Sequence, residues 1–162
     1  MQRVYDLLYG LTGEFDLRYL LHKALRSIRR ELSDASAAVY LCSHGEFLAH
    51  LADPQADPDD LADLEDAFTD IIVAEVLATL DPVIIPTPAQ QEPFLPESPL
   101  RGLSVLALPV RTDFAIVGVV VVYRSAQMPL TVREQHRIAP MMEPLGRAIA
   151  AAEKVQHLAG GR

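Results

Sequence analysis

The chain has a single cysteine, Cys42, among its 162 residues, so it cannot form an internal disulfide. It also has no run of about 20 apolar residues, the length that a membrane-spanning helix requires. Its first residues, MQRVYDLLYG, lack the long apolar segment and small-residue cleavage site of a signal peptide. These absences together predict a soluble, cytoplasmic protein that does not associate with a membrane.

Positive charge is missing from the middle of the sequence. Lys and Arg are absent between Arg30 and Arg101, where Asp and Glu number 15, and the formal net charge of the chain is −8. An acidic region of this kind repels phosphate groups, so we expect no nucleic acid to bind there. As a solvated surface, the same region would keep the protein soluble.

Apolar residues make up half of the chain, enough for one domain with a substantial core. They are densest in RGLSVLALPVRTDFAIVGVVVVYRS, residues 101–125. A strand exposed on one face alternates apolar and polar residues, whereas a continuous Val-rich run is typical of a strand covered on both faces. We therefore predict that Leu103–Arg111 and Ala115–Arg124 form a hairpin in the middle of a sheet with helices against it.

Helical spacing of apolar residues predicts an amphipathic helix that begins after Asp16, and its opposite face is basic. The basic residues of that face are Arg18, Lys23, Arg26, Arg29 and Arg30. Strands are predicted at residues 37–42 and 46–51, followed by two helices within residues 58–80. The second of these helices carries Ile71, Ile72, Val76 and Leu80 on its apolar stripe.

The second half of the chain is punctuated by proline. Pro82 and Pro86 flank a short strand suited to a sheet edge, and a proline-rich loop follows at residues 87–102. Thr131 and Glu134 form a capping box that starts the last helix, which Pro140 and Pro144 should kink or locally break. Strand hairpins with helices between them indicate an α+β fold with an antiparallel sheet.

Five segments resemble the GAF domain family, and they occur in the family's order. They are DLRYLLHKALRSIRREL leading into AAVYLC, EVLATLDPVIIPTP, LSVLALPV, FAIVGVVVVYRS, and MPLTVREQHRIAPMMEPLGRAIAAAEKV. The resemblance covers about residues 14–157, with an N-terminal helix or linker at 1–13 and a disordered tail at 158–162. It implies a central antiparallel sheet of five to six strands. The terminal helices would cover one face, and the middle helices with the long loop would enclose a pocket on the other.

The resemblance also implies a function. GAF domains are usually regulatory modules that bind a small molecule, commonly dimerise through their terminal helices, and pass the binding event to a signalling or transcriptional partner. The expectation is therefore a sensory homodimer without enzymatic activity. The same fold with a filled core, used only for dimerisation or scaffolding, is the alternative.

The ligand class stays open, although several family branches fit poorly. Covalent bilin attachment needs a cysteine near the middle helices, and methionine sulfoxide reduction uses several thiols, whereas Cys42 stands alone at the end of the first strand. Cyclic-nucleotide binding is associated with an asparagine-containing motif, and this sequence has no asparagine. Haem needs an axial ligand, for which His50 is the one histidine with suitable placement. A metal would need clustered ligands, and His50 with Asp53 is one possible pair.

By analogy with the family, we expect the pocket to have a helical wall, a lid and a polar edge. Arg101 is the first positive charge after seventy residues without one, and it could hold an anionic ligand or neutralise nearby carboxylates. Cys42 with His44 is a conceivable nucleophile pair, but no orienting acid is evident. The predicted ligand-binding residues are Phe68, Ile72 and Val76 for the wall, Phe94 and Leu95 for the lid, Arg101 and Ser104 for the edge, and His50.

Overall fold

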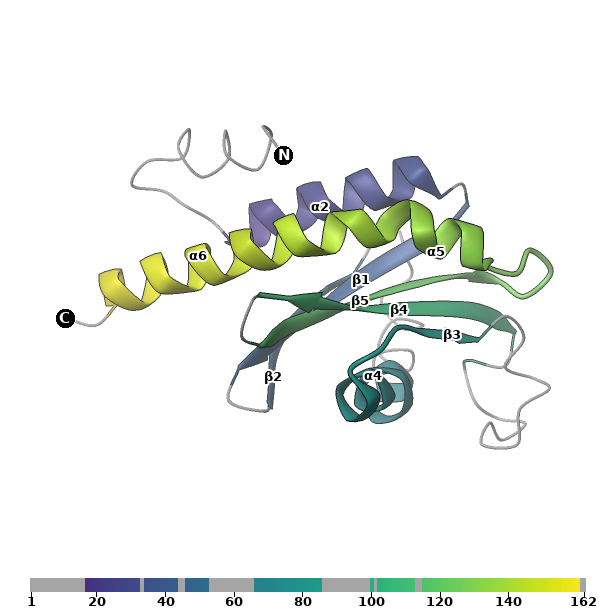
Figure 1. The fold of residues 1–162 in the computed structure, drawn as a ribbon, viewed down its shortest axis with the longest axis horizontal. Coiled ribbons are helices and arrows are strands. Elements are labelled where there is room, and N and C mark those ends of the chain that lie inside the picture. Colours follow the sequence, from purple (N-terminus) through teal and green to yellow (C-terminus); the bar gives the residue numbers. More distant parts are fainter. Residues whose placement is uncertain are drawn as a thin grey trace.

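The computed structural model describes residues 17–32, 34–43, 46–52, 66–85, 100, 102–112 and 115–160. These residues form one antiparallel sheet with helices on both faces (Figure 1), which confirms the predicted α+β class. The sheet has five strands in the order β2-β1-β5-β4-β3. The strands are β1 (Ser36–Ser43), β2 (Glu46–Ala52), β3 (Val83–Ile85), β4 (Leu103–Arg111) and β5 (Ile116–Ser125).

The Val-rich strand β5 lies at the centre of this sheet, between β1 and β4. Its residues 119–122 are completely buried, so both faces of the strand are covered as the uninterrupted apolar run predicts. Because side chains alternate along a strand, Val120 and Val122 join one core cluster and Val119 and Val121 join the other. The sheet therefore separates two cores.

The first core lies under the terminal helices, which run together along one face of the sheet (Figure 1). They are α2 (Leu17–Glu31), α5 (Val132–Ile138), the 3₁₀ turn η3 (Ala139–Met141) and α6 (Met142–Gly160). The apolar stripe of α2, which includes Leu21, Leu25 and Ile28, packs into this core with Leu145 and Ile149 of α6. This confirms that the first and last helices share a face.

A close approach of backbones brings α6 onto the sheet. Gly146 is buried, and a Cβ atom added to it would lie 2.1 Å from the main-chain oxygen of Arg111 at the end of β4. No real side chain can occupy that space, so only glycine lets α6 lie so close to the strand. The helix continues to Gly160, into the segment 158–162 that the sequence predicts as a disordered tail.

The second core lies under η1 (Phe68–Val73) and α4 (Ala74–Thr79) on the opposite face (Figure 1). The segment η1 is π-helical, and it is continuous with α4. A π-turn spaces facing residues five apart, so Phe68 and Val73 are buried on the same side. The helix is continuous from residue 66 to residue 79, so the second predicted helix does not begin at Ile71, whereas residues 58–65 of the first predicted helix lie outside the described residues.

The sequence predicts that Leu80 extends the apolar stripe of the helix, but it does not. It ends α4 in the left-handed conformation with φ 63°, and 53% of it is exposed. Its N–H donates to the carbonyl of Val76 as part of this C-terminal cap. A turn that reverses the chain before Asp81 and Pro82 thus overrides the helical periodicity.

The capping box of the last helical unit is confirmed: Thr131 accepts from the N–H of Glu134, and the Glu134 carboxylate accepts from the N–H of Thr131. Pro140 interrupts the helix as predicted, because the 3₁₀ turn η3 contains it. The prediction that Pro144 also breaks the helix is wrong. Pro144 is the third residue of α6, in the first turn, where a backbone N–H has no helical acceptor in any case.

Candidate functional site

Three aromatic rings meet on the sheet face that η1 covers. Phe68 packs edge-on against Tyr40 of β1, with ring centroids 6.5 Å apart, and against Tyr123 of β5 at 5.1 Å. All three residues are buried. Rings at these separations attract one another beyond their area of contact, so they bind η1 to β1 and β5 and give this face an aromatic floor.

The predicted helical wall shares Phe68 with this group of rings. Phe68, Ile72 and Val76 are each no more than 1% exposed, and all three belong to the core between η1–α4 and the sheet. Their burial follows from the spacing of η1 and α4, which turns these residues toward Val105, Val119 and Val121. The structure thus brings the three wall residues together, in contact with the sheet.

Ser104 does not lie with the wall. Its neighbours in β4, Val105 and Ala107, contribute to the core under α4, whereas Leu106 contributes to the core under the terminal helices. Strand alternation therefore places Ser104 on the terminal-helix face. Its fully buried hydroxyl donates to the carbonyl of Ile85 at 3.4 Å and accepts from the N–H of Leu130 at 2.8 Å.

Of the other predicted site residues, the structure describes only His50. Phe94, Leu95 and Arg101 lie outside the described residues, as does the Asp53 of the possible metal pair. His50 is paired with Tyr40 in the β1–β2 ladder, so its backbone adjoins the aromatic floor. Among the residues that the structure describes, no group of three or more His, Cys, Asp or Glu is placed to hold a metal ion.

An ion pair that the sequence did not reveal lies close to Ser104. Arg124, opposite Ser104 in the β4–β5 ladder, donates two hydrogen bonds to the Glu134 carboxylate at 2.7 and 2.8 Å. It also donates to the carbonyls of Met128 and Pro129. The capping box identified Glu134, but its second partner depends on the path of the β5–α5 connection, which sequence spacing does not give.

The surroundings of Glu134 set its charge. Partial burial by itself raises the pKa of this carboxyl group, but the hydrogen bonds from Arg124 and Thr131 and the positive charge of Arg124 outweigh it. The pKa is consequently lower than its ordinary value. Glu134 thus stays ionised and holds the start of α5 to the end of β5.

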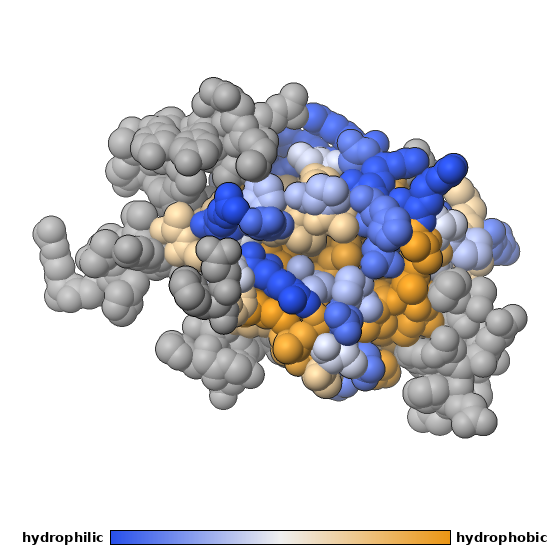
Figure 2. All heavy atoms as spheres, viewed as in Figure 1, coloured by the Kyte–Doolittle hydropathy of each residue, from blue (hydrophilic) through white to orange (hydrophobic). Residues whose placement is uncertain are grey.

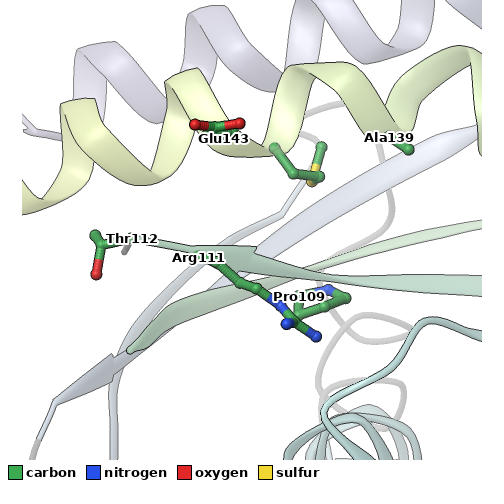
Figure 3. Close-up of a pocket in the computed structure, with 6 residues that line it drawn as sticks. Pro109, Arg111, Thr112, Ala139 and Glu143 are labelled. Atoms are coloured by element: carbon green, nitrogen blue, oxygen red, sulfur yellow. The ribbon is translucent and has the colours of Figure 1, made fainter. Parts of the chain in front are cut away.

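An open pocket of about 350 Å³ lies on the terminal-helix side, between the end of β4 and the start of α6. It is lined by Pro109, Arg111, Thr112, Ala139, Met142 and Glu143. Figure 3 shows that the Arg111 side chain points away from the Glu143 carboxylate, so the two charges do not converge on a common ligand position. This pocket does not coincide with the predicted ligand chamber under α4.

Helices of the described segments include none that is both long and apolar enough to cross a bilayer. A comparison of the sequence with curated proteins gave no match. Solved structures, in contrast, resemble the fold along most of its length.

The GAF domain/HD domain protein of Geobacter sulfurreducens has a TM-score of 0.67 and 18% identity, with 88% of this chain and 97% of that chain covered. The GAF3 domain of a Synechocystis protein, in its photoproduct state, has a TM-score of 0.64 and 19% identity, with coverage of 88% and 99%. A type II free methionine-R-sulfoxide reductase of Thermoplasma acidophilum has a TM-score of 0.58 and 11% identity, with coverage of 82% and 91%. At these identities the likeness establishes the fold.

Family membership follows from the sequence itself, because the model of the GAF domain family matches residues 16–149, most of the chain. GAF domains are generally sensory or regulatory modules of signalling proteins, alongside effector domains. The matched residues include all five strands and both helical layers. The protein belongs to the GAF domain family.

Proposed function

We propose that this chain is a sensory GAF module that binds a small molecule on the α4 face of its sheet. The aromatic floor of Tyr40, Phe68 and Tyr123 is the observation that carries the proposal. Aromatic side chains are typical linings of sites that bind small molecules in a mostly apolar environment. Ile72 and Val76 form the helical wall, with Phe94 and Leu95 as the lid.

Polar recognition in this proposal comes from Arg101 and His50. Arg101 holds the negative charge of an acidic ligand, so Arg101→Ala weakens such a ligand and leaves a neutral one almost unaffected. His50 adjoins the floor through its pairing with Tyr40. Ser104 is left out of the ligand contacts, because its hydroxyl bonds to backbone groups on the other face of the sheet.

In this proposal, the protein is a cytoplasmic homodimer whose GAF domain extends over residues 14–157. The signal leaves through the terminal helices. A ligand transmits a signal only if it binds one arrangement of the protein more tightly than another. Here the differing arrangements are those of η1–α4 against the sheet. The β5–α5 connection then carries the change to α6, because Arg124 and Glu134 join β5 to the start of α5. The receiver is a signalling or transcriptional protein.

A module that only dimerises or scaffolds is the second candidate. The wall residues favour it, because Phe68, Ile72 and Val76 pack directly on the sheet. Catalysis finds less support. One structural neighbour is a methionine sulfoxide reductase, but this chain has Cys42 as its single thiol and thus no second thiol with which to form a disulfide during turnover.

Native mass spectrometry of freshly purified protein tests the proposal. We expect a dimer that retains a small molecule, and Ile72→Ala should lose that extra mass because it opens the ligand's wall. Ile149→Ala is the matched control: it removes the same atoms from an equally buried site on the other face, and should keep the ligand. A protein that carries no small molecule, and that no compound in a metabolite panel stabilises, would support the scaffold instead.

A further inference from the structure

The outer surface of the terminal helices carries a group of exposed positive charges, which we call the basic surface: Lys23, Arg26 and Arg30 of α2 with Arg133 and Arg137 of α5. Residues three or four apart lie on one side of a helix, so each helix contributes one row. The rows meet because Arg137 donates to the carbonyl of Glu31 at the end of α2, at 3.1 Å. Figure 2 shows hydrophilic residues over this region.

These charges lack counterions within the described part of the chain. No described carboxylate lies within ion-pairing distance of any of the five side chains, although Glu31 and Asp34 are nearby in sequence. Lys23 instead lies over the ring of Tyr19, 5.7 Å from its centroid. In contrast, Arg124 and Arg147 are paired with Glu134 and Glu143.

Fold stability does not account for the whole of the basic surface. Lys23 with Arg26, Arg26 with Arg30, and Arg133 with Arg137 are like-charge neighbours on a helix, an arrangement that destabilises it. Arg133 is in the first turn of α5, where the helix dipole disfavours a positive charge. Arg30, in the last turn of α2, and Arg137, in the last turn of α5, have favourable positions. Solubility is no explanation either, because the protein as a whole is acidic.

We propose that the basic surface is the docking site for a carboxylate-rich segment of the effector protein. The role given to this partner rests on the proposed signalling function, but the binding itself does not. Arg predominates in the surface, and its planar guanidinium recognises carboxylates through paired hydrogen bonds. The surface covers α2 and α5, which adjoin the output helix α6, so an effector bound there would sense movement of that helix.

Other occupants fit less well. A two-fold dimer centred on the basic surface would place the same positive charges opposite each other. A membrane-binding helix inserts an apolar face, but the apolar face of α2 is buried in the core. A nucleic acid would carry its phosphates beyond this surface toward the acidic side of the protein, where Asp66, Asp70 and Glu75 are exposed.

Binding of a fluorescein-labelled oligoglutamate peptide, followed by fluorescence anisotropy, tests the proposal. We expect the intact protein to bind the peptide at low ionic strength and to lose affinity as salt is added. Arg26→Glu and Arg133→Glu should each weaken binding about tenfold. The matched control is Arg111→Glu, which makes the same change of charge at an exposed arginine outside the basic surface, at the C-terminal end of β4. This variant should bind the peptide normally.

Thermal unfolding separates a binding role from a structural one. Glu at position 26 would face Lys23 and Arg30, and Glu at position 133 would face Arg137 and suit the helix dipole, so both variants should unfold at or above the wild-type temperature. Weaker binding with undiminished stability supports the proposal. Ile72→Ala should still bind the peptide, which distinguishes this inference from a failure of the ligand proposal.

Three results would overturn it. One is peptide binding that Arg26→Glu and Arg133→Glu leave unchanged. A second is stronger binding to duplex DNA or to phosphatidylserine vesicles than to oligoglutamate, which would identify a phosphate-bearing partner. The third is salt-sensitive self-association without peptide binding, which would identify a second copy of this chain, docked through its acidic side.

Discussion

The two faces of the sheet are covered in different ways. On one face, the long helices α2 and α6 pack together with the short helix α5, with Gly146 against β4 and the Arg124–Glu134 ion pair at the β5–α5 connection. On the other face, the short helical segment η1–α4 is held by aromatic and aliphatic side chains, among them Phe68 and Ile72. Apolar contacts are non-directional, whereas the first face adds directional polar bonds and a close backbone contact.

This difference indicates a division of labour. A helical layer fixed by directional bonds keeps one position relative to the sheet and suits the transmission of force. A layer held by apolar contacts can shift over the sheet at smaller cost, as a ligand-dependent wall must. The π-helical geometry of η1 also supports a ligand-dependent role for this layer, because π-turns occur frequently at functional sites.

The largest expected effect is on the terminal-helix face. Gly146→Ala would place a methyl group 2.1 Å from the carbonyl oxygen of Arg111 in its present position, so α6 must move away from β4. We expect a loss of about 3 kcal/mol in the free energy of unfolding, at the upper end for overpacking. Chemical denaturation measures it. Gly102→Ala is the control, since nothing lies within 4 Å of its added Cβ, and an equal loss in both variants would refute the close contact.

A smaller effect is expected at the ion pair of the same face. Glu134→Gln should cost about 1.5–3 kcal/mol near neutral pH, the range for a hydrogen bond to a charged group. Because the pKa of Glu134 is lowered in the folded state, its contribution is present above the unfolded value of about 4.5 and is lost as pH falls through the folded value. The denaturation curves of wild type and Glu134→Gln should therefore approach each other as the pH is lowered from neutral into the acidic range. Parallel curves would show that the ion pair contributes nothing.

The sequence predicted most of the architecture. The valine run of β5 predicted a covered central strand because a strand exposed to water on one side would need polar residues at alternate positions. The capping box predicted the start of α5 because its hydrogen bonds are local. Leu80 and Pro144 were mispredicted for the converse reason: whether a residue ends or continues a helix depends on where the chain goes next.

The candidate site was less predictable. Phe68, Ile72 and Val76 were assigned to the wall by analogy with the family, and the structure places all three in one core cluster against the sheet. Ser104 was assigned to the wrong face of the sheet, because its face depends on the register of β4 against β5, which sequence spacing left undetermined. Tyr40 and Tyr123 were not singled out at all, although strand alternation would have placed Tyr123 with Val119 and Val121.

Amide hydrogen exchange of the ligand-free protein measures the contrast between the two faces most directly. We predict that amides of η1 and α4 exchange through local opening, at a clearly lower free energy than those of β5 and of α6 around Gly146, which should open only with global unfolding. Equal protection of both helical layers would contradict the account, because the wall over the aromatic floor could not then move independently of the output helices.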